Sequence, residues 1–399
     1  MVVINSLAKL LEPLTEEEFL ASFWGKNYKH VRGGAGKFTE MMPWAHLNYV
    51  LRHHRLDFPR LRLVQDGERP PVASYIRYVK GRQGRLTPRL RPAEINNYLR
   101  QGATVVLDAV DELHEPTEEL AAVLERFFCE RVQINLYAGW QTSRGFDLHW
   151  DDHDVFILQV AGRKRWSVYG MTRPYPVADD IEEAQKPTDA PVWEETLEDG
   201  DLLYIPRGWW HVAQPLAEPT LHLTVGIHQR TGLDLMRWLT ERLRARATFR
   251  QDMPRLANAD ERATHAARLR QELLAELDDA VLERFFREHD ATAESRARFS
   301  LPSSATAEAL PDAPDTLLRW MPPRPLELKA ENGVVEFACH KKRWRFAEDA
   351  LLVLQPLEER RVCSVAELCE TAAVRLDART VRAFLRELLL HGLVAVVDR

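Results

Sequence analysis

The sequence predicts an α+β protein in which a β-rich central segment lies between helical segments. Three observations lead to this prediction. Between residues 131 and 228, short runs of alternating polarity are broken by glycine and proline, which is typical of antiparallel strands. After residue 228 these runs stop, and apolar residues recur at helical spacing. Over about 327–399 the order is helix, helix, helix and terminal strand, which is the order of a winged helix.

The first 130 residues predict helices and one strand. LTEEEFLASFW (14–24) opens with a helix start signal, Thr-Glu-Glu-Glu, ahead of an apolar face. Residues 44–56 and 92–101 also have helical patterns, VVLDAV (105–110) is typical of a strand, and PTEELAAVLERFF (116–128) predicts an amphipathic helix capped by Thr117.

The predicted strands of the central segment are five apolar or alternating runs. They are RVQINLYA (131–138), DVFILQVA (154–161), KRWSVYG (164–170), DLLYIP (201–206) and LHLTVGIH (221–228). Glycine, proline and acidic turns separate them, so we expect an antiparallel arrangement.

Helices are predicted to follow at 232–247 and 260–289. In the second, one stripe contains Leu269, Leu273, Leu277, Val281 and Phe285, and Leu274 and Leu282 widen it. This stripe can pack within its own domain or on a second subunit. The expected domains are a β-rich domain (1–228), a helical domain (229–300), a linker rich in Pro, Ser and Ala (301–326) and a winged-helix unit (327–399).

Composition excludes several classes of protein. The formal net charge of −6 over 399 residues argues against a domain devoted to nucleic-acid phosphates, so no nucleic-acid partner is expected. Four scattered cysteines fit neither a metal knuckle nor a disulfide framework. There is no secretory signal and no long apolar run, so we expect a cytoplasmic enzyme or binding protein without a membrane partner.

The stretch HWDDHD (149–154) carries candidate metal ligands. His149 and Asp151 are two residues apart, so on a strand both emerge from one face. His211, which ends GDLLYIPRGWWH, is the best third ligand. Two imidazoles and one carboxylate suit non-haem Fe(II), and catalytic zinc is the competing metal. A hydrated acidic loop with incidental histidines is the ordinary alternative. Asp152, His153 and Asp154 are interpreted as surface groups, or as groups that orient a ligand imidazole.

Polar faces of the predicted strands indicate a pocket beside this metal. Gln133, Asn135 and Tyr137 share one face of their strand, and His222, Thr224 and His228 share one face of theirs. Such strands can be half exposed, or they can line the lumen of a barrel that binds a polar small molecule. Lys164 alternates with Trp166 and Val168, so it is the candidate cation for an anionic cosubstrate; a solvated basic turn is the alternative.

With these residues in place, a family resemblance emerges. HWDDHDVFILQVAGRKRW followed by GDLLYIPRGWWH resembles the JmjC-type 2-oxoglutarate- and Fe(II)-dependent oxygenases of the cupin superfamily, and is most similar to the bacterial ribosomal oxygenases. The entry segment FLASFWGKNYKHVRGG (19–34) and RARFSLP (296–302) are similar to theirs as well. The resemblance implies a double-stranded β-helix barrel, then a helical dimerisation domain and a C-terminal winged helix.

The same resemblance implies roles for seven residues. It implies iron held by His149, Asp151 and His211, and 2-oxoglutarate as cosubstrate with its distal carboxylate paired to Lys164. It further implies that three residues line the cosubstrate pocket: Asn135, Tyr137 and Thr224. One segment departs from the family. AGWQTSRGFDL (138–148) replaces a Pro-Gly-Ser-Gln-type stretch at the substrate entrance, which puts the identity of the substrate in doubt.

The expected function is therefore a protein hydroxylase that acts on an arginyl or histidyl side chain of a ribosomal protein. A homodimer through the 229–300 helices is expected. The alternatives are an oxygenase of a small metabolite or peptide natural product, a non-catalytic winged-helix or cupin binding protein, and a lysine demethylase. The domain order favours the protein hydroxylase, because added helical and winged-helix domains can form a wide cleft for a polypeptide.

Overall fold

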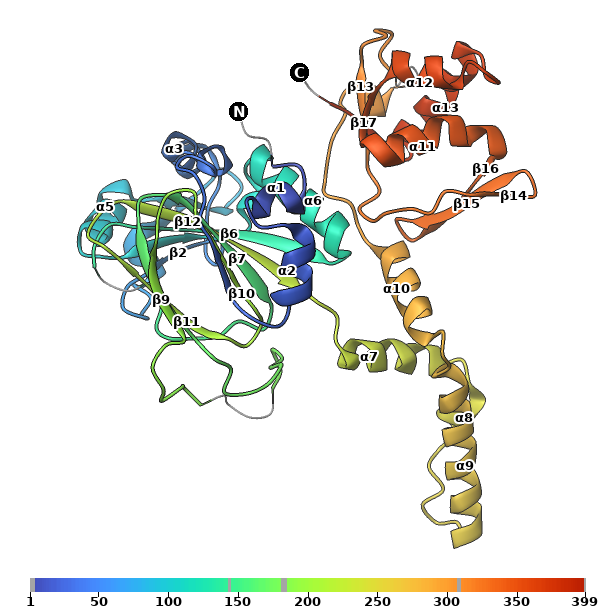
Figure 1. The fold of residues 1–399 in the computed structure, drawn as a ribbon, viewed down its shortest axis with the longest axis horizontal. Helices are drawn as coiled ribbons and strands as arrows, with labels where there is room; N and C mark the ends of the chain where they lie inside the picture. Colours follow the sequence, from blue (N-terminus) through green and yellow to red (C-terminus); the bar gives the residue numbers. More distant parts are fainter. Residues whose placement is uncertain (1–3, 143–144, 181–184, 307–309, 398–399) are drawn as a thin grey trace. The chain divides into compact units, whose positions relative to one another are not determined.

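The computed structural model describes residues 4–142, 145–180, 185–306 and 310–397. The chain divides into two compact units, Met1–Gln229 and Arg230–Arg399 (Figure 1). Helices and strands both contribute substantially, which confirms the predicted α+β class. None of the helices in the described ranges combines the length and the apolar character needed to cross a membrane.

The first unit contains two antiparallel sheets. The larger has the strand order β1-β10-β7-β12-β6-β5-β2, and the smaller has the order β11-β8-β9. The strands are β1 (Lys29–Val31), β2 (Leu61–Val64), β5 (Thr104–Leu107), β6 (Arg131–Gly139), β7 (Asp154–Ala161), β8 (Lys164–Tyr169), β9 (Trp193–Leu197), β10 (Leu202–Ile205), β11 (Trp210–Pro215) and β12 (Thr220–His228). A separate hairpin consists of β3 (Ile76–Lys80) and β4 (Leu86–Leu90).

The two sheets pack face to face. Val155 and Ile157 of β7 and Leu203 of β10 share a buried cluster with Trp166 and Val168 of the smaller sheet. Because side chains alternate along a strand, the same two large-sheet strands also present apolar residues to their other face. The polar residues of β6 and β12 therefore fall on the face that looks toward the small sheet.

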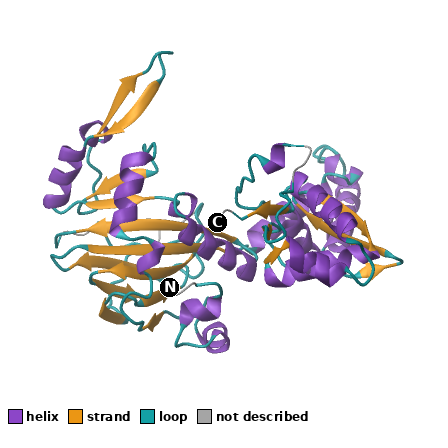
Figure 2. Cartoon of the chain, turned by 90° about the horizontal axis from the view of Figure 1, so that it is seen from above, coloured by secondary structure: helices purple, strands orange, loops and turns teal. Residues whose placement is uncertain are grey.

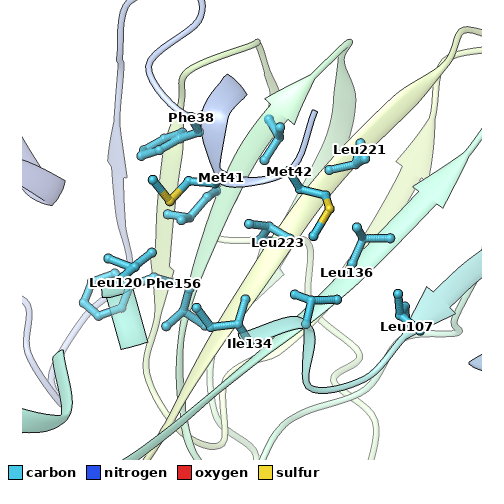
Figure 3. Packing of buried hydrophobic residues seen from close by; sticks show 14 of the residues in the cluster. Phe38, Met41, Met42, Leu107, Leu120, Ile134, Leu136, Phe156, Leu221 and Leu223 are labelled. Carbon is cyan, nitrogen blue, oxygen red and sulfur yellow. The ribbon is translucent and has the colours of Figure 1, made fainter. Parts of the chain in front are cut away.

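The outer face of the large sheet is covered by the N-terminal helices (Figures 1 and 2). Phe38, Met41 and Met42, from the chain around the short 3₁₀ helix η1 (Thr39–Met41), pack near Leu223 of β12 (Figure 3). The helices of this unit are α1 (Leu7–Leu11), α2 (Glu16–Ser22), α3 (Trp44–His53), α4 (Val72–Tyr75), α5 (Pro92–Arg100) and α6 (Glu115–Phe128), with a second 3₁₀ helix, η2 (Val110–Glu112). This core holds the sheet that carries the candidate site.

The N-terminal elements that were predicted are present, with one cap in error, but the expectation of a single strand is wrong, because β1, β2, β3 and β4 precede β5. Thr15 caps α2 by accepting a hydrogen bond from the Glu18 amide at 3.2 Å, as the start signal indicated. The predicted cap Thr117 is wrong. His114 occupies the N-cap of α6, and the Thr117 hydroxyl lies inside the first turn, where it donates to the His114 carbonyl. Pro116 explains the earlier start, because proline is favoured in the first turn of a helix.

The second unit begins with four helices. They are α7 (Gly232–Leu243), α8 (Ala247–Arg250), α9 (Ala259–Glu276) and α10 (Val281–Thr292). The predicted single helix over 260–289 is wrong, because the chain leaves the helix at Leu277 and α10 starts at Val281. Asp278 explains the break: its carboxylate accepts from the Ala280 amide at 3.0 Å, a local bond that competes with helical hydrogen bonding.

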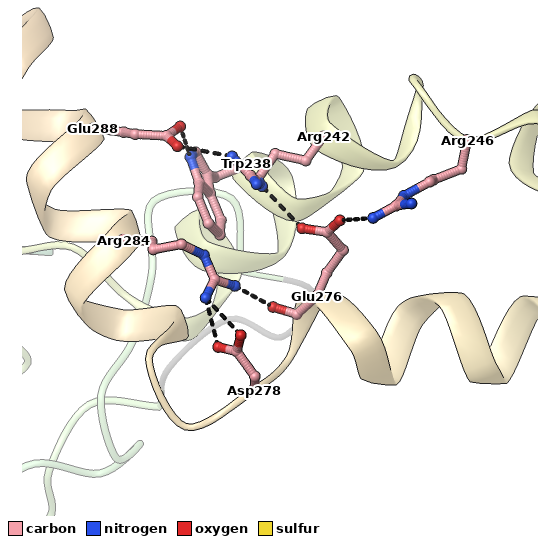
Figure 4. Close-up of polar contacts among 7 residues, drawn as sticks. All are labelled: Trp238, Arg242, Arg246, Glu276, Asp278, Arg284 and Glu288. Atoms are coloured by element: carbon pink, nitrogen blue, oxygen red, sulfur yellow. Dashed lines mark hydrogen bonds and ion pairs between the residues drawn. The ribbon is translucent and has the colours of Figure 1, made fainter.

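Ion pairs connect these helices (Figure 4). The carboxylate of Glu276, which is buried, accepts hydrogen bonds from Arg242 at 3.1 Å and Arg246 at 2.6 Å. Trp238 donates to Glu288 at 3.0 Å, and its ring meets the Phe285 ring edge-on. Of the predicted apolar stripe, Phe285 is buried, while the flanking Leu274 and Leu282 are exposed.

The rest of the second unit combines two small sheets with three helices. Strand β13 (Leu317–Trp320) lies between β17 (Val362–Ser364) and β18 (Val394–Val396), and the other sheet has the order β14 (Ala330–Glu331), β15 (Val334–Cys339), β16 (Lys342–Ala347). The helices are α11 (Leu351–Arg360), α12 (Val365–Ala372) and α13 (Ala378–Leu390), with 3₁₀ helices η3 (Ser303–Ala305) and η4 (Glu348–Ala350).

Strand β13 corrects the expected linker. It falls inside 301–326, yet Leu318 and Trp320 are fully buried in the core of this unit. The Trp320 indole donates to Glu358 at 2.8 Å. A strand of four residues is too short to show a clear alternation of apolar and polar side chains. The many prolines around it therefore led to the prediction of a linker.

Candidate metal centre

Backbone pairing brings the first and third candidate ligands together. His149 and His211 form an isolated antiparallel bridge, with N–H···O distances of 2.8 and 3.2 Å. His211 lies on β11, while His149 and Asp151 lie in an extended segment before β7, which starts only at Asp154. The expectation that 149–151 belongs to a regular strand is therefore wrong, although the bridge gives the His149 segment the same extended geometry. The Asp151 carbonyl accepts from the Gly208 amide at 2.9 Å, which fixes the second ligand segment against the β10–β11 turn.

The three side chains converge. One ligand atom from each of His149, Asp151 and His211 lies within 4.8 Å of the others. His211 Nε2 is 3.5 Å from an Asp151 carboxylate oxygen, and the two imidazole centroids are 4.4 Å apart. An ion bound equally to all three would fit in this space, because metal–nitrogen and metal–oxygen bonds are about 2.0–2.2 Å long.

Backbone carbonyls set the orientation of both imidazoles. His149 Nδ1 lies 2.8 Å from the Asp147 carbonyl, and His211 Nδ1 lies 3.0 Å from the Trp209 carbonyl. A carbonyl can only accept, so each Nδ1 carries the proton and each Nε2 keeps its lone pair. Both free lone pairs are thus available to a cation.

The protonation states suit a divalent cation. Burial, together with the neighbouring His149, lowers the pKa of His211 to about 4, so its imidazole is neutral near pH 7. Burial alone would raise the pKa of Asp151, but the adjacent His211 and His149 outweigh it and hold that pKa below its usual value. The site therefore presents the negative charge of Asp151 beside the neutral imidazole of His211.

A cavity of about 190 Å³ opens beside these ligands, between the two sheets. Lys164, the first residue of β8, lines it and is 4% exposed. Burial lowers the pKa of Lys164 to about 7. Its ammonium group makes no ion pair with any residue in the described ranges. The alternative of a solvated basic turn is wrong for Lys164, because the side chain points into the protein together with Trp166, as the alternation predicted.

Several buried polar atoms along the cavity lack a partner. Thr104 Oγ1, Trp166 Nε1, His222 Nδ1 and Arg62 Nε are buried and make no hydrogen bond. Buried polar atoms in folded proteins are nearly always satisfied, and leaving one unpaired costs about 1–3 kcal/mol. Unpartnered donors beside a buried ammonium fit an anionic ligand with several oxygen atoms, such as a dicarboxylate.

The structure separates the other predicted pocket residues. Tyr137 and Thr224 line the cavity; Asn135 does not. The Asn135 carboxamide oxygen instead accepts from the Ala109 amide at 3.0 Å and from Gln133 at 3.1 Å. The Tyr137 ring stacks on His222 with a centroid distance of 4.9 Å, and burial raises the pKa of its hydroxyl.

Sequence reasoning missed Arg62 and Thr104 as lining residues, whereas His222 was named with Thr224 on a polar face that could line the lumen. Arg62 and Thr104 come from β2 and β5, at the edge of the large sheet, and no local motif marks them. His222 did carry a signal, because it shares a polar face with Thr224 across from Tyr137 on the paired strand β6.

The acidic neighbours of Asp151 do not orient the ligand imidazoles. Asp154 is buried and accepts from the Tyr204 hydroxyl at 2.5 Å, away from the three ligands. His153 lies 2.9 Å from the Asp152 carboxylate, and its ring is 4.2 Å from that of His228. These residues form a separate group, so the interpretation that they hold a ligand imidazole is wrong.

Comparisons with known proteins agree with this geometry. Residues 110–235 match the JmjC domain family. The "bifunctional lysine-specific demethylase and histidyl-hydroxylase NO66" of Drosophila persimilis is 28% identical over 240 residues, which cover 57% of this chain and 32% of the relative. "Ribosomal oxygenase 1" of Rattus norvegicus is 30% identical over 231 residues, which cover 55% and 36%. The chain spans about a third of the length of these curated relatives.

Solved structures share the fold. Escherichia coli ribosomal oxygenase YcfD aligns over 96% of this chain and 98% of its own with a TM-score of 0.62 and 20% identity. A second structure of YcfD, in complex with cobalt and 2-oxoglutarate, aligns over 97% and 99% with a TM-score of 0.58. The likeness shows that this chain has the same JmjC-type cupin fold of mixed helices and sheets.

Proposed function

We propose that this chain, a JmjC-domain protein related to the ribosomal oxygenases, is an Fe(II)- and 2-oxoglutarate-dependent oxygenase that hydroxylates an arginyl or histidyl side chain of a ribosomal protein. One observation carries the proposal. Two imidazoles and one carboxylate converge at a cavity that also contains a buried lysine without a carboxylate partner among the described residues.

His149, Asp151 and His211 would hold the metal. These three protein ligands leave up to three of the six coordination positions of iron free. That number suits non-haem iron, because a bidentate cosubstrate needs two positions and dioxygen needs one. When bound, iron and 2-oxoglutarate would supply the activation of dioxygen, which takes two electrons from the oxidation of the keto acid to succinate and carbon dioxide and two from the C–H bond that is hydroxylated. The protein itself binds and orients the components and keeps water away from the reacting atoms.

Lys164 would hold the distal carboxylate of 2-oxoglutarate. An ammonium group buried alone is unfavourable, and a charge-assisted hydrogen bond to a carboxylate offsets that cost. Tyr137 and Thr224 add hydroxyl groups to the same cavity, and the unpartnered Thr104 hydroxyl can donate as well. Asn135 would act indirectly, because its carboxamide holds neighbouring groups rather than facing the cavity.

A polypeptide substrate is supported by the rest of the chain. The relatives are named histidyl-hydroxylase or ribosomal oxygenase, and a cytoplasmic location fits an enzyme that acts on a ribosomal protein. We assign 229–300 to a helical dimerisation domain, because Leu233, Met236, Leu274 and Leu282 of α7, α9 and α10 are exposed in the single chain. The order of α11, α12, α13 and β18 supports a winged helix over 327–399.

The test is the intact mass of ribosomal proteins from cells with and without this protein. We expect one ribosomal protein to carry one additional oxygen only when the enzyme is present. Loss of a methyl group instead would favour the demethylase activity named for the Drosophila relative. An unchanged set of masses would contradict the proposed substrate class.

The metal assignment has its own test. His149→Ala and Asp151→Ala should abolish succinate formation and reduce binding of Co(II), used in place of Fe(II), while the circular-dichroism spectrum and melting temperature stay near those of the parent protein. His153→Gln is the matched control, because this neighbouring residue lies outside the three-ligand group, and it should retain activity. Full activity in either alanine variant would remove that residue from the metal site.

A further inference from the structure

We propose that the β3–β4 hairpin binds RNA. The basic hairpin, residues 76–91, contains six basic residues and no acidic residue. They are Arg77, Lys80, Arg82, Arg85, Arg89 and Arg91. The hairpin is a sheet of its own, outside the two sheets that enclose the cavity, and Figure 2 shows it projecting beyond them at the upper left. A local positive charge of this density is unusual in a chain whose net charge is −6.

The hairpin cations are exposed and unpaired. All of them except Arg91 are exposed, and these five form no ion pair and no side-chain hydrogen bond with any residue that the structure describes. Arg91, at the base, bonds to Glu94 and the Ser74 carbonyl and so serves the fold. The remaining five have no structural role that accounts for them.

Two arginines stand directly opposite each other. In the register of the hairpin, Arg77 pairs with Arg89, so both side chains emerge from the same face. Like charges in this position destabilise an antiparallel pair by a few tenths to about 1 kcal/mol. An anion bound between them would remove the repulsion, and a phosphate group is the anion for which arginine is best suited.

The second basic run of the chain behaves differently. KKRWR (341–345) has a similar charge density, yet Lys341 lies 2.6 Å from Glu294, and Arg343 and Arg345 lie 3.6 and 3.4 Å from Glu336. Carboxylates of the same chain therefore partly neutralise that run. In the basic hairpin, Glu94 pairs with Arg91 at the base and Asp57 accepts from the Tyr78 hydroxyl, but the five exposed cations form no ion pair with a carboxylate in the part of the chain that the structure describes. These five cations are therefore better suited to an external polyanion than KKRWR is.

The opposite face of the hairpin favours RNA among polyanions. Tyr78 is 46% exposed and Leu86 is 58% exposed, and both emerge from the same face as Lys80. Arg55, which donates to the Leu86 carbonyl at 3.1 Å, extends the basic surface toward the exposed residues at the end of α3. Unstacked bases of RNA loops stack on aromatic rings while arginine and lysine hold the phosphates.

The choice of RNA over DNA rests on the proposed function, because a ribosomal-protein substrate lies next to ribosomal RNA. The expectation of no nucleic-acid partner came from the charge of the whole chain. Phosphate binding depends on the local arrangement of cations, so an acidic chain can carry a basic binding element.

The experiment is fluorescence anisotropy with a labelled RNA stem–loop and the full-length, metal-free protein. Four hairpin arginines are changed together, and four residues of the other basic run are changed as the matched control. The hairpin variant is Arg77→Gln, Arg82→Gln, Arg85→Gln and Arg89→Gln; the control is Lys341→Gln, Lys342→Gln, Arg343→Gln and Arg345→Gln. We expect the hairpin variant to bind at least about tenfold more weakly and to flatten the slope of log affinity against log salt by roughly 3, and the control to stay near the parent protein.

A double variant, Arg77→Gln with Arg89→Gln, should flatten the slope by about 1.4 and raise hairpin stability, since it removes the facing charges. Parent-like RNA binding by the four-residue hairpin variant overturns the proposal, as does an equal loss in the control. Tighter binding of a DNA duplex, or equal competition by polyglutamate, also overturns it. RNA binding is measured without turnover, and the hairpin variant should still form succinate with a peptide substrate, so failure here and failure of the oxygenase assignment are distinguishable.

Discussion

Lys164 lines the same cavity as the Asp151 carboxylate, but its ammonium group forms no ion pair with any residue that the structure describes. In the unfolded chain this amine has a pKa near 10.4, and in the folded chain burial lowers the pKa to about 7. The unfolded state therefore binds more protons between about pH 7 and pH 10, so this residue makes the protein less stable at neutral pH and the loss diminishes as the pH rises. A group that costs stability in the free protein is expected to act in binding.

Replacing the ammonium should separate stability from binding. Lys164→Met should raise the free energy of unfolding at pH 7 by about 2 kcal/mol or more, because the buried charge is removed while the apolar length is kept. The Michaelis constant for 2-oxoglutarate should rise by about 100-fold, because the distal carboxylate loses its partner. Urea denaturation and succinate formation measure the two effects. An unchanged Michaelis constant would remove Lys164 from the cosubstrate site.

The same pKa predicts how cosubstrate binding depends on pH. A carboxylate pairs with the protonated amine, which in the free protein is the minor form above about pH 7. The affinity of the parent protein for 2-oxoglutarate should therefore be constant below pH 7 and fall by about tenfold per pH unit above it. Isothermal titration calorimetry with the Co(II)-loaded protein between pH 6 and about pH 9 is the measurement, and Lys164→Met should show no such fall.

At the scale of single elements, the turn from β7 to β8 positions Lys164. Gly162 has a φ of +65°, and a Cβ atom there would lie 2.1 Å from the Pro219 carbonyl oxygen. Gly162→Ala should lower the free energy of unfolding by about 2–4 kcal/mol, because both the backbone conformation and the close approach exclude a side chain. It should also weaken 2-oxoglutarate binding.

Gly170 is the matched control for this prediction. A Cβ atom on Gly170 meets no heavy atom within 4 Å, so Gly170→Ala should change stability by less than about 0.5 kcal/mol. Equal effects of the two substitutions in thermal and chemical denaturation would show that the turn is not constrained as described.

In the helical part of the second unit, Glu276 joins three helices through its carboxylate (Figure 4). The hydrogen bonds from Arg246 and Arg242 hold the pKa of Glu276 below its usual value. Glu276→Ala should lower stability by about 1–3 kcal/mol, less than a fully buried pair would lose, because the arginines are partly exposed. Glu241→Ala breaks an exposed pair with Arg244 and should cost less than about 0.5 kcal/mol. Urea denaturation measures both losses of stability. If Glu276→Ala lowered the free energy of unfolding by no more than Glu241→Ala does, the network would be contradicted.

Helices and strands with a clear polar–apolar pattern in their own sequence were predicted. Strands that form only because they pair with another strand were not. The long runs at β6, β7 and β12 alternate or are wholly apolar, so they were recognisable. Strand β11 carries His211 but has the irregular sequence WHVAQP, and it exists as a strand because it pairs with β8. The break between α9 and α10 was missed because apolar residues recur at helical spacing on both sides of it, which predicted one continuous helix through Asp278.

For the molecule as a whole, the division into two units predicts independent folding. All residues of the metal group and of the cavity belong to Met1–Gln229, and the core clusters of that unit do not extend beyond it. A protein ending at Gln229 should therefore unfold in one cooperative transition and bind Co(II) and 2-oxoglutarate with affinities within about threefold of the full chain. Calorimetry of binding and of unfolding are the measurements; loss of cosubstrate binding would show that the second unit completes the site.

The sequence by itself determined the α+β class, the order of the elements that alternate clearly, and the candidate ligands His149, Asp151 and His211; for Lys164 it left an inward side chain and a solvated basic turn both open. These follow from periodicity and from residue types whose spacing is local. The tertiary structure decided that Arg62, Thr104 and His222 face the cavity while Asn135 does not, and that β13 belongs to a core. It also decided that the five exposed cations of the basic hairpin form no ion pair in the described ranges. Each of these depends on which distant segments pack together, because burial and pairing are properties of the folded contacts and leave no periodic trace in the chain.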